Sequence, residues 1–237
     1  MIQIQNLCKR FGNFCAVNNL SLHIKKGEVF ALLGLNGAGK STTIGILCGL
    51  IEKTSGTVLI DNKNLDTQLE AIKKSVNLSP QETAIAPNLT VFENLELIAT
   101  LYGQKSQEKI FDTIKQFSLQ EKTNVLAKKL SGGQKRRLSV AMAIITNPKI
   151  LILDEPTLGL DIKARKKLWE IIKTLAQTTT IILTTHYLEE AEALANRIGV
   201  MANGKLVGVG TRTELIARTK TQNFEDAFLK LTEESDE

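Results

Sequence analysis

Short apolar runs recur along the chain between polar links, and they alternate with stretches of helical periodicity. The runs are strand-like because they are rich in β-branched and other apolar residues. Early in the chain they are IQIQNL, LSLHI, VFALLG and TVLI, and from residue 150 onward they are ILILDE, TIILTT, RIGVMA and KLVGVG. Strands that alternate with helices indicate a parallel α/β sheet.

Helical patterns are predicted for residues 40–50, 161–176, 188–195 and 224–231. Residues 90–147 show successive helical patterns without a convincing strand, so we expect a helical insert on the α/β core. The early strands are joined by short polar links, at Asn18-Asn19 and at residues 25–27, which favours antiparallel pairing. Residues 61–64 (DNKN) predict a turn because Asn tolerates left-handed dihedral angles.

Composition and charge narrow the function classes only slightly. Hydrophobic residues make up 43% and charged residues 23%, as in an ordinary soluble globular protein. The net charge of +5 would permit attraction to phosphates or to an anionic membrane surface. Lys163, Lys166 and Lys167 follow a helical pattern, however, and we interpret such lysines as a solvated face.

Cysteine spacing and hydropathy argue against several kinds of site. The three cysteines, Cys8, Cys15 and Cys48, form no CxxC pair, so neither a disulfide framework nor a zinc site is predicted. We interpret them as buried free thiols in a reducing compartment. The first residues lack a basic segment followed by an apolar stretch, so no signal peptide is expected. No run of about 18 apolar residues occurs, so any membrane spans would come from another chain.

A glycine-rich loop lies between an apolar strand and a helical pattern. The loop fits G-x-x-x-x-G-K-[ST] and comprises Gly34, Leu35, Asn36, Gly37, Ala38, Gly39, Lys40, Ser41 and Thr42. Its glycines let backbone N–H groups wrap phosphates, and the helix N-terminus directs partial positive charge at them. Lys40 can reach the β- and γ-phosphates, and the Ser41 hydroxyl can bind Mg²⁺. The loop predicts nucleotide binding but leaves GTPases, kinases and other ATPases open.

An acidic pair follows the apolar run at residues 150–153. The carboxyl end of a buried strand is where ligands bind in open α/β sheets. Asp154 can therefore help to hold Mg²⁺, and Glu155 can polarise a water molecule for attack on the γ-phosphate. Ordinary turn acids are the alternative, which the upstream phosphate loop makes less attractive.

A second glycine-rich helix start, LSGGQ at residues 130–134, is the most specific pattern in the chain. Ser131 reads as an N-cap of a helix that runs toward Ile145. Gly133 and its neighbour let a backbone approach an anion, so this helix start is a second phosphate-binding device. Because one nucleotide rarely needs two such devices from one chain, we expect a head-to-tail dimer in which each phosphate loop faces the second device of the other chain. A capped surface helix is the plainer alternative.

Together these motifs resemble the ATP-binding subunits of ABC transporters, over nearly the whole length. GLNGAGKST resembles their Walker A motif, ILILDEP their Walker B motif and LSGGQ their signature motif. The resemblance implies further roles: Gln81 as the Q-loop glutamine near Mg²⁺, Asp161 in the D-loop, and His186 as the switch histidine. It also implies Phe11 as the ring that stacks on adenine and Val17 as an apolar contact beside it. The catalytic residues implied are Glu155, His186, Lys40 and Gln81.

The fold implied is α/β, with a P-loop NTPase core of mostly parallel sheet, an antiparallel β subdomain and an α-helical subdomain. We expect one ABC ATPase domain over residues 1–237. Its core and antiparallel subdomain would occupy residues 1–86 and 148–218, its helical subdomain residues 87–147, and a C-terminal helix residues 223–232. Two departures from the family pattern, Leu158 and Ile162, leave the details of the D-loop contacts open.

The kind of ABC protein is predicted by resemblance. TTHYLEEAEALANRIGVMANGKLVGVGT, FENLELIATLYG and NFEDAFLKLT resemble subunits that drive drug and polysaccharide export. The cofactors implied are ATP and Mg²⁺. The partners implied are a second copy or a homologous subunit and membrane-spanning permease subunits, and no nucleic acid. The place implied is the cytoplasmic face of the cell membrane, as a peripheral subunit.

Two alternatives belong to other classes. A DNA-repair or chromosome ATPase usually carries long coiled coils or zinc modules, whereas residues 41–131 leave no room for coiled coils and contain no cysteine beyond Cys48. A soluble ABC ATPase of iron–sulfur cluster assembly stays open. In the transporter reading, residues 82–96 form the surface that meets the membrane subunit. Its exposed apolar candidates are Ile85, Leu89, Val91 and Phe92, although Val91 and Phe92 could equally pack inside the helical insert.

Overall fold

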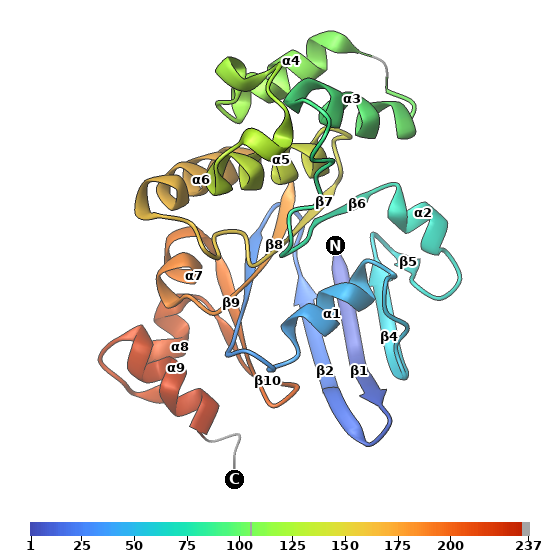
Figure 1. The fold of residues 1–237 in the computed structure, drawn as a ribbon. Helices are drawn as coiled ribbons and strands as arrows, with labels where there is room; N and C mark the ends of the chain where they lie inside the picture. Colours follow the sequence, from blue (N-terminus) through green and yellow to red (C-terminus); the bar gives the residue numbers. More distant parts are fainter. Residues whose placement is uncertain (105, 234–237) are drawn as a thin grey trace.

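The computed structural model describes residues 1–104 and 106–233, and its centre is a six-stranded, mostly parallel sheet. Helices lie on both sides of this sheet (Figure 1). The strand order is β10-β9-β3-β8-β7-β6. The bounds are β3 Val29–Leu33, β6 Val76–Ser79, β7 Ile150–Asp154, β8 Thr180–Thr185, β9 Arg197–Ala202 and β10 Lys205–Gly210.

The three central strands are buried along their whole length, which is typical of strands in a parallel sheet. Every residue of β3, β7 and β8 is buried, as expected where helices cover both faces. Alternate residues of β3 belong to different cores: Ala31 and Leu33 to one, Phe30 and Leu32 to the other. The strand that leads into the phosphate loop is therefore fixed by packing on both sides.

A second, four-stranded antiparallel sheet has the order β2-β1-β4-β5. Its strands are β1 Ile2–Phe11, β2 Phe14–Ile24, β4 Ser55–Ile60 and β5 Lys63–Asn64. The antiparallel pairing agrees with the prediction, but the link at residues 25–27 does not join paired strands, because it leads from β2 into β3 of the other sheet. The predicted link at Asn18-Asn19 is wrong, because β2 runs straight through it. Asn19 takes a positive φ of 51° there, and the pairing with β1 shifts in register nearby, so a bulge absorbs the polar pair.

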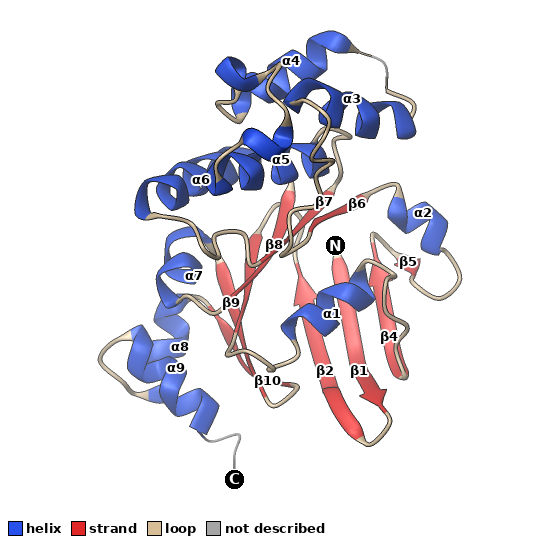
Figure 2. Ribbon diagram, in the orientation of Figure 1, coloured by secondary structure: helices blue, strands red, loops and turns tan. Residues whose placement is uncertain are grey.

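The turn predicted at residues 61–64 is confirmed in its first half. Asp61 and Asn62 have φ values of 52° and 61°, whereas Lys63 and Asn64 already form β5. The helices of the α/β part are drawn in blue in Figure 2. They are α1 Lys40–Leu47, α2 Leu69–Lys73, α6 Ile162–Leu175, α7 Leu188–Leu194, α8 Arg212–Thr219 and α9 Phe224–Glu233. Neither α2 nor β6 was predicted from the sequence.

The helical insert is confirmed. It contains α3 Val91–Leu101, α4 Gln107–Gln116 and α5 Gly132–Ile144, with short 3-10 turns at Gln120–Lys122 and Ala127–Lys129. Between residues 90 and 147, the described part of the chain has no strand and only one isolated bridge, Thr90 to Leu126. The insert lies at one end of the sheet (Figure 1). The subdomain boundaries at residues 86/87 and 147/148 stay predictions.

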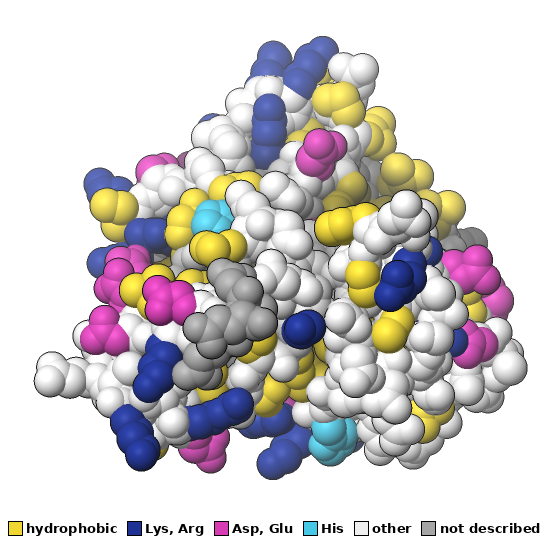
Figure 3. Space-filling view, turned by 90° about the horizontal axis from the view of Figure 1, so that it is seen from below, with side chains coloured by type: hydrophobic (Ala, Val, Ile, Leu, Met, Phe, Trp, Pro, Cys, Tyr) yellow, Lys and Arg dark blue, Asp and Glu magenta, His cyan; other side chains and the backbone are white. Residues whose placement is uncertain are grey.

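The surface carries its charge in mixed form. On the face drawn in Figure 3, Lys and Arg side chains lie among Asp and Glu side chains and uncharged surface. The net charge of +5 is therefore not gathered there into a single basic patch. Among the described residues, no helix is long and apolar enough to cross a membrane.

Candidate functional site

The phosphate loop joins β3 to α1 and leaves its backbone donors available. Gly34 N donates to Thr185 O at 3.2 Å, which ties the loop to the end of β8. Gly39 is the N-cap of α1, with φ 99° and no side-chain capping hydrogen bond. A Cβ at Gly39 would lie 2.4 Å from Ala16 O, so only glycine fits. The uncapped helix start can therefore give its first N–H groups to an anion.

Lys40 lies inside this loop rather than in solvent, with 5% of its surface exposed. Its Nζ donates to Gly34 O at 2.7 Å and to Leu35 O at 3.1 Å, and it lies 3.4 Å from Glu155 Oε1. The ammonium is thus held at the loop by carbonyl groups and one carboxylate. Phosphate oxygens arriving at the loop would meet a charge already in position.

Asp154 and Ser41 meet where β7 ends and α1 begins. Asp154 Oδ1 accepts hydrogen bonds from Ser41 Oγ at 3.4 Å and from Thr184 Oγ1 at 2.5 Å. A hydroxyl and a carboxylate are hard oxygen donors, and Mg²⁺ is usually held by one or two such groups together with substrate phosphates. The donor set therefore fits Mg²⁺. Gln81, which follows β6, lines the cavity that Ser41 also lines.

Glu155 is held in an unusual backbone conformation at the end of the same strand. Its φ is 47°, and its amide donates to Thr184 O at 3.2 Å and to Thr184 Oγ1 at 3.0 Å. The side chain is 6% exposed, and its Oε2 lies 2.6 Å from His186 Nδ1. Such strain concentrates at functional sites. The Glu155 carboxylate is held between the Lys40 ammonium and the His186 imidazole. A general base needs such a fixed position.

These groups line one cavity of about 450 Å³. Its lining comprises Phe14, Ala16, Asn36, Gly37, Gly39, Lys40, Ser41, Thr42, Gln81, Glu155, Leu158 and His186. Nine of these residues were candidates from the sequence: all of them except Phe14, Ala16 and Leu158. The structure therefore brings the phosphate loop together with Gln81, Glu155 and His186, which lie far apart in the chain. Gly34 and Ala38 are buried within the loop, and Leu35 is exposed.

Phe11 and Val17 are placed differently from the other candidates. Phe11 is half exposed, with Lys9 Nζ 4.6 Å from its ring centroid, and it is not among the residues that line the cavity. Val17 is fully buried in the core under the antiparallel sheet. Phe14, which pairs with Phe11 across the β1–β2 hairpin, lines the cavity instead. Sequence reasoning missed Phe14, although its position opposite Phe11 at a two-residue turn was a usable signal.

The LSGGQ helix start borders a separate cavity of about 590 Å³. Ser131 caps α5 as predicted: Ser131 Oγ accepts from Gln134 N at 3.3 Å, and Gln134 Oε1 accepts from Ser131 N at 3.0 Å. Asp161 caps α6 in the same way, accepting from Ala164 N at 2.9 Å. Two helix N-termini therefore face one cavity.

Packing between α5 and α6 requires a glycine at residue 133. A Cβ at Gly133 would lie 2.8 Å from the Cβ of Ala164, whereas nothing lies within 4 Å of a Cβ at Gly132. The cavity is also bordered by the basic side chains of Arg137, Lys163 and Lys167. Lys163 and Lys167 had been interpreted only as a solvated face. The cationic lining suits an anionic ligand.

The two cavities have no lining residue in common. Residues of the phosphate loop, Glu155 and His186 line one cavity, and Ser131, Gly133 and Asp161 line the other. Within one chain, the second helix start is therefore not a wall of the phosphate-loop cavity.

Residues 17–158 match the protein family described as ABC transporter. The chain is 37% identical over 222 residues to the linearmycin resistance ATP-binding protein LnrL of Bacillus subtilis, covering 92% of this chain and 71% of that protein. It is 38% identical over 220 residues to the Nod factor export ATP-binding protein I of Cupriavidus metallidurans, covering 91% and 73% respectively. It is 40% identical over 217 residues to the human phospholipid-transporting ATPase ABCA3, of which it spans only 13%.

Two solved structures are similar along their length. A dimeric ATP-binding cassette in a post-hydrolysis state, bound to ADP and Pi, has a TM-score of 0.81 and 28% identity, covering 89% of this chain and 98% of that chain. An ATP-binding subunit of an ABC transporter has a TM-score of 0.88 and 27% identity, covering 98% and 99%. These likenesses agree with the fold predicted from the motifs.

Proposed function

The chain belongs to the ABC transporter family, and on that premise we propose that two copies bind two ATP head to tail and drive export through separate membrane-spanning subunits. The observation that carries the dimer is the separation of the two cavities. One cavity is lined by Lys40, Glu155 and His186, and the other by two capped helix starts and the Ser131 hydroxyl. Facing copies would complete each site.

In the proposed reaction, the amides of the phosphate loop and Lys40 hold the β- and γ-phosphates. Glu155 accepts a proton from the attacking water, and His186 orients that carboxylate from 2.6 Å away. Ser131 of the second chain contacts the γ-phosphate from the opposite side. Water is excluded when the chains close, which strengthens these polar contacts.

We propose that Mg²⁺ is held by Ser41 and Asp154, with Gln81 beside it. When bound, Mg²⁺ neutralises charge on the phosphates and assists in-line transfer. Thr184 orients the Asp154 carboxylate by donating a hydrogen bond from Oγ1 to Oδ1. Such support of a ligating carboxylate typically matters for metal affinity.

Phe14 and Phe11 are the proposed base-contacting rings. They are cross-strand partners at the hairpin tip, and Phe14 lines the cavity at the phosphate loop. Stacking on a ring reads the flat face of a base and little of its edge. ATP binding would then depend mainly on the phosphates, with the rings adding affinity.

Export is proposed from the relatives. One is named for linearmycin resistance and another for Nod factor export, and both are covered over about seven tenths of their length. The transported compound is recognised by other chains in this proposal. The peripheral position on the cytoplasmic face of the membrane follows from the same reasoning.

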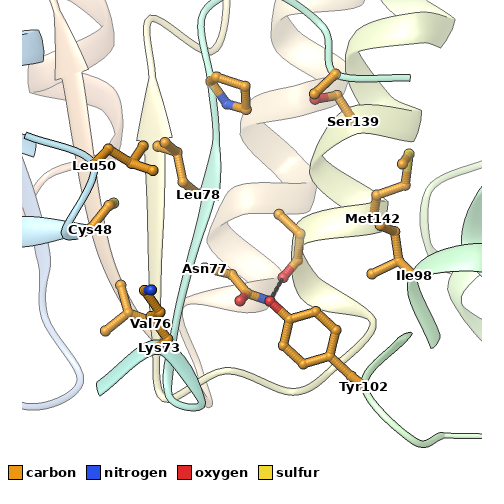
Figure 4. A pocket seen from close by; sticks show the side chains of 13 residues that line it. Cys48, Leu50, Lys73, Val76, Asn77, Leu78, Ile98, Tyr102, Ser139 and Met142 are labelled. Atoms are coloured by element: carbon orange, nitrogen blue, oxygen red, sulfur yellow. Dashed lines mark hydrogen bonds between the residues drawn. The ribbon is translucent and has the colours of Figure 1, made fainter. Parts of the chain in front are cut away.

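A groove suited to the membrane subunit lies between the sheet edge and the helical insert. Its cavity of about 320 Å³ is lined by Cys48, Leu50, Lys73, Val76, Asn77, Leu78, Pro80, Ala84, Ile98, Tyr102, Ser139, Met142 and Ala143. Figure 4 shows Cys48, Leu50 and Leu78 on one side and Ile98 and Met142 on the other. Leu50 is 70% exposed and Tyr102 is 51% exposed, so the described residues leave this apolar surface uncovered.

This groove changes the prediction for residues 82–96. Only Ala84 of that segment lines the groove. Of the two alternatives left open for Val91, packing inside the insert is the one observed: Val91 is fully buried in the main core as the first residue of α3. Phe92 is partly buried, with its ring centroid 5.3 Å from that of Phe111. Ile85 and Leu89 are half-buried, so we propose Leu50, Ala84 and Tyr102 as the stronger contacts.

The dimer is tested by Glu155→Gln with ATP and Mg²⁺. Removing a general base typically lowers the rate by about 10²–10⁴-fold, so ATP should persist and hold two chains together. Light scattering should show a dimer with ATP–Mg²⁺ and a monomer with ADP. Glu189→Gln, a change to an exposed acid near His186, is the matched control and should hydrolyse ATP as the native chain does. A monomer at every protein concentration would argue against shared sites.

A further inference from the structure

Arg136, on the helix that begins with LSGGQ, is buried although two basic neighbours flank it. Only 4% of its surface is exposed, whereas Lys135 and Arg137 are half-buried. A charged group this deep is costly unless its donors are satisfied. Its position in α5 therefore requires specific partners.

The partners are four backbone carbonyl groups. Nε donates to Pro156 O at 2.8 Å, and Nη2 donates to Asp154 O at 2.6 Å. Nη1 donates to Pro80 O and, at 3.3 Å, to Gln81 O. In the part of the chain that the structure describes, no carboxylate forms an ion pair with this guanidinium. Burial lowers the pKa of Arg136 to about 10, against the opposing effect of Asp154, Glu190 and Glu155, so it is charged at neutral pH.

The four carbonyls belong to segments that carry the chemistry of the phosphate-loop cavity. Pro80 and Gln81 begin the loop after β6, Asp154 ends β7, and Pro156 starts the chain toward Asp161. Glu155 lies between two of the bonded carbonyls. A guanidinium is a rigid planar fork, so it fixes the spacing of its acceptors in a way that a flexible ammonium does not.

The same helix carries Ser131 at its first turn, on the other cavity. Arg136 therefore connects the helix that carries Ser131, which would serve the nucleotide of a second chain, with the segments that line the phosphate-loop cavity of its own chain. Glu155 and Gln81 both line the phosphate-loop cavity. Arg136 donates to the carbonyl group of Gln81 and to those of Asp154 and Pro156, the residues on either side of Glu155.

We propose that Arg136 is a positioning residue that couples the two ATP sites of the dimer. A nucleotide bound at Ser131 shifts α5, and the guanidinium carries that shift to the backbone of Gln81 and of Asp154–Pro156. This inference rests on the proposed function, because it uses the roles of Gln81, Glu155 and Ser131 given above.

Arg136→Lys and Arg136→Met test the coupling. Lysine keeps the charge but cannot bridge three segments with one ammonium, and methionine removes both. Each variant should bind ATP as a single chain within about twofold of the native affinity, because no phosphate contact is lost. The turnover number should fall by roughly tenfold or more, and the Hill coefficient for ATP should fall toward 1.

A stability control separates coupling from simple loss of folding. Val58→Ala removes buried atoms from β4, far along the chain from these segments, and lowers stability by the loss of core packing. Assayed below its unfolding temperature, it should keep the native turnover number and Hill coefficient. A loss equal to that of the Arg136 variants in this control would overturn the proposal.

If the Arg136 variants do not fold, hydrogen exchange in chains that retain Arg136 tests the proposed coupling. Amide hydrogen exchange in residues 80–86 is compared between the ATP-bound Glu155→Gln dimer and the ATP-bound single chain of Ser131→Arg. Slower exchange only in the dimer supports coupling through α5, and equal exchange overturns it. Native turnover and cooperativity in a folded Arg136 variant would also overturn it. Failure of the native chain to bind ATP would instead overturn the proposed function.

Discussion

The two glycine-rich helix starts of this chain look alike in sequence and differ in structure. At α1 the N-cap is Gly39, no side chain caps the helix, and Lys40 behind it is buried. At α5 Ser131 is exposed, and its hydroxyl and the Gln134 amide close a capping box. The start of α1 follows β3 and packs against Ala16 of β2, whereas the start of α5 lies beside α6 at an open cavity.

The difference teaches what each start is prepared to do. The N-terminal N–H groups of α1 have no side-chain cap, so an anionic ligand next to Lys40 can supply their hydrogen-bond acceptors. A capped, exposed start is already satisfied, so it needs little from a ligand and is ready to present a hydroxyl to another surface. In the proposed dimer, one chain holds the nucleotide by the first start, and hydrolysis requires the second start from the other chain.

The largest effect is expected from Lys40→Ala. This change removes the ammonium that donates to Gly34 O and Leu35 O and that lies beside the Glu155 carboxylate. ATP binding should weaken strongly, and turnover should fall by on the order of 10³-fold or more. Equilibrium binding and phosphate release measure both. Lys26→Ala, at the exposed link after β2, is the control and should match the native chain. Native turnover without Lys40 would remove the distinction between the two starts.

Ser131→Arg should block turnover and spare ATP binding by the single chain, because Ser131 lies in the other cavity. A loss of at least 10²-fold is expected, as for other lost transition-state donors. Mixing this variant with Lys40→Ala sharpens the comparison. A mixed dimer has one site with both defects and one with neither, so activity should partly return. Absence of recovery despite demonstrated mixed dimers would count against sites shared between chains.

Gly133→Ala tests how closely the second start depends on α6. The new Cβ would meet Ala164 at 2.8 Å, so α5 and α6 must separate. Overpacking of this kind typically costs about 1–3 kcal/mol, which urea unfolding can measure. Gly132→Ala is the matched control, since its Cβ meets nothing within 4 Å. Equal stability of the two variants would show that the contact with Ala164 is easily relieved.

The smallest effect is expected from Ser131→Ala on stability. Loss of an N-cap typically costs about 1 kcal/mol of folding free energy. Urea unfolding should show this decrease in Ser131→Ala, and an equal decrease in Thr211→Ala, which removes a similar capping box from α8. An unchanged free energy of unfolding in Ser131→Ala, beside a decrease in Thr211→Ala, would mean that the capping bonds of Ser131 contribute little to stability.

Predictions from the sequence succeeded where one contiguous segment decides the structure. The phosphate loop, the buried strands β7 and β8, the Ser131 cap and the helical insert were all predicted. They failed at β6, whose four residues have too few apolar positions for a pattern and pair only because β7 lies beside them. Asn18-Asn19 failed because tertiary pairing overrode a local turn preference.

The candidate site divides along the same line. The sequence by itself determined which groups could bind phosphate, hold Mg²⁺ or act as a base, because these depend on residue type and on spacing within a few residues. Only the tertiary structure decided that Phe14 faces the cavity, that Arg136 lies inside with four carbonyl partners, and that the two helix starts belong to separate cavities. Those outcomes depend on packing between segments far apart in the chain, which bury or expose a side chain regardless of its own sequence neighbours.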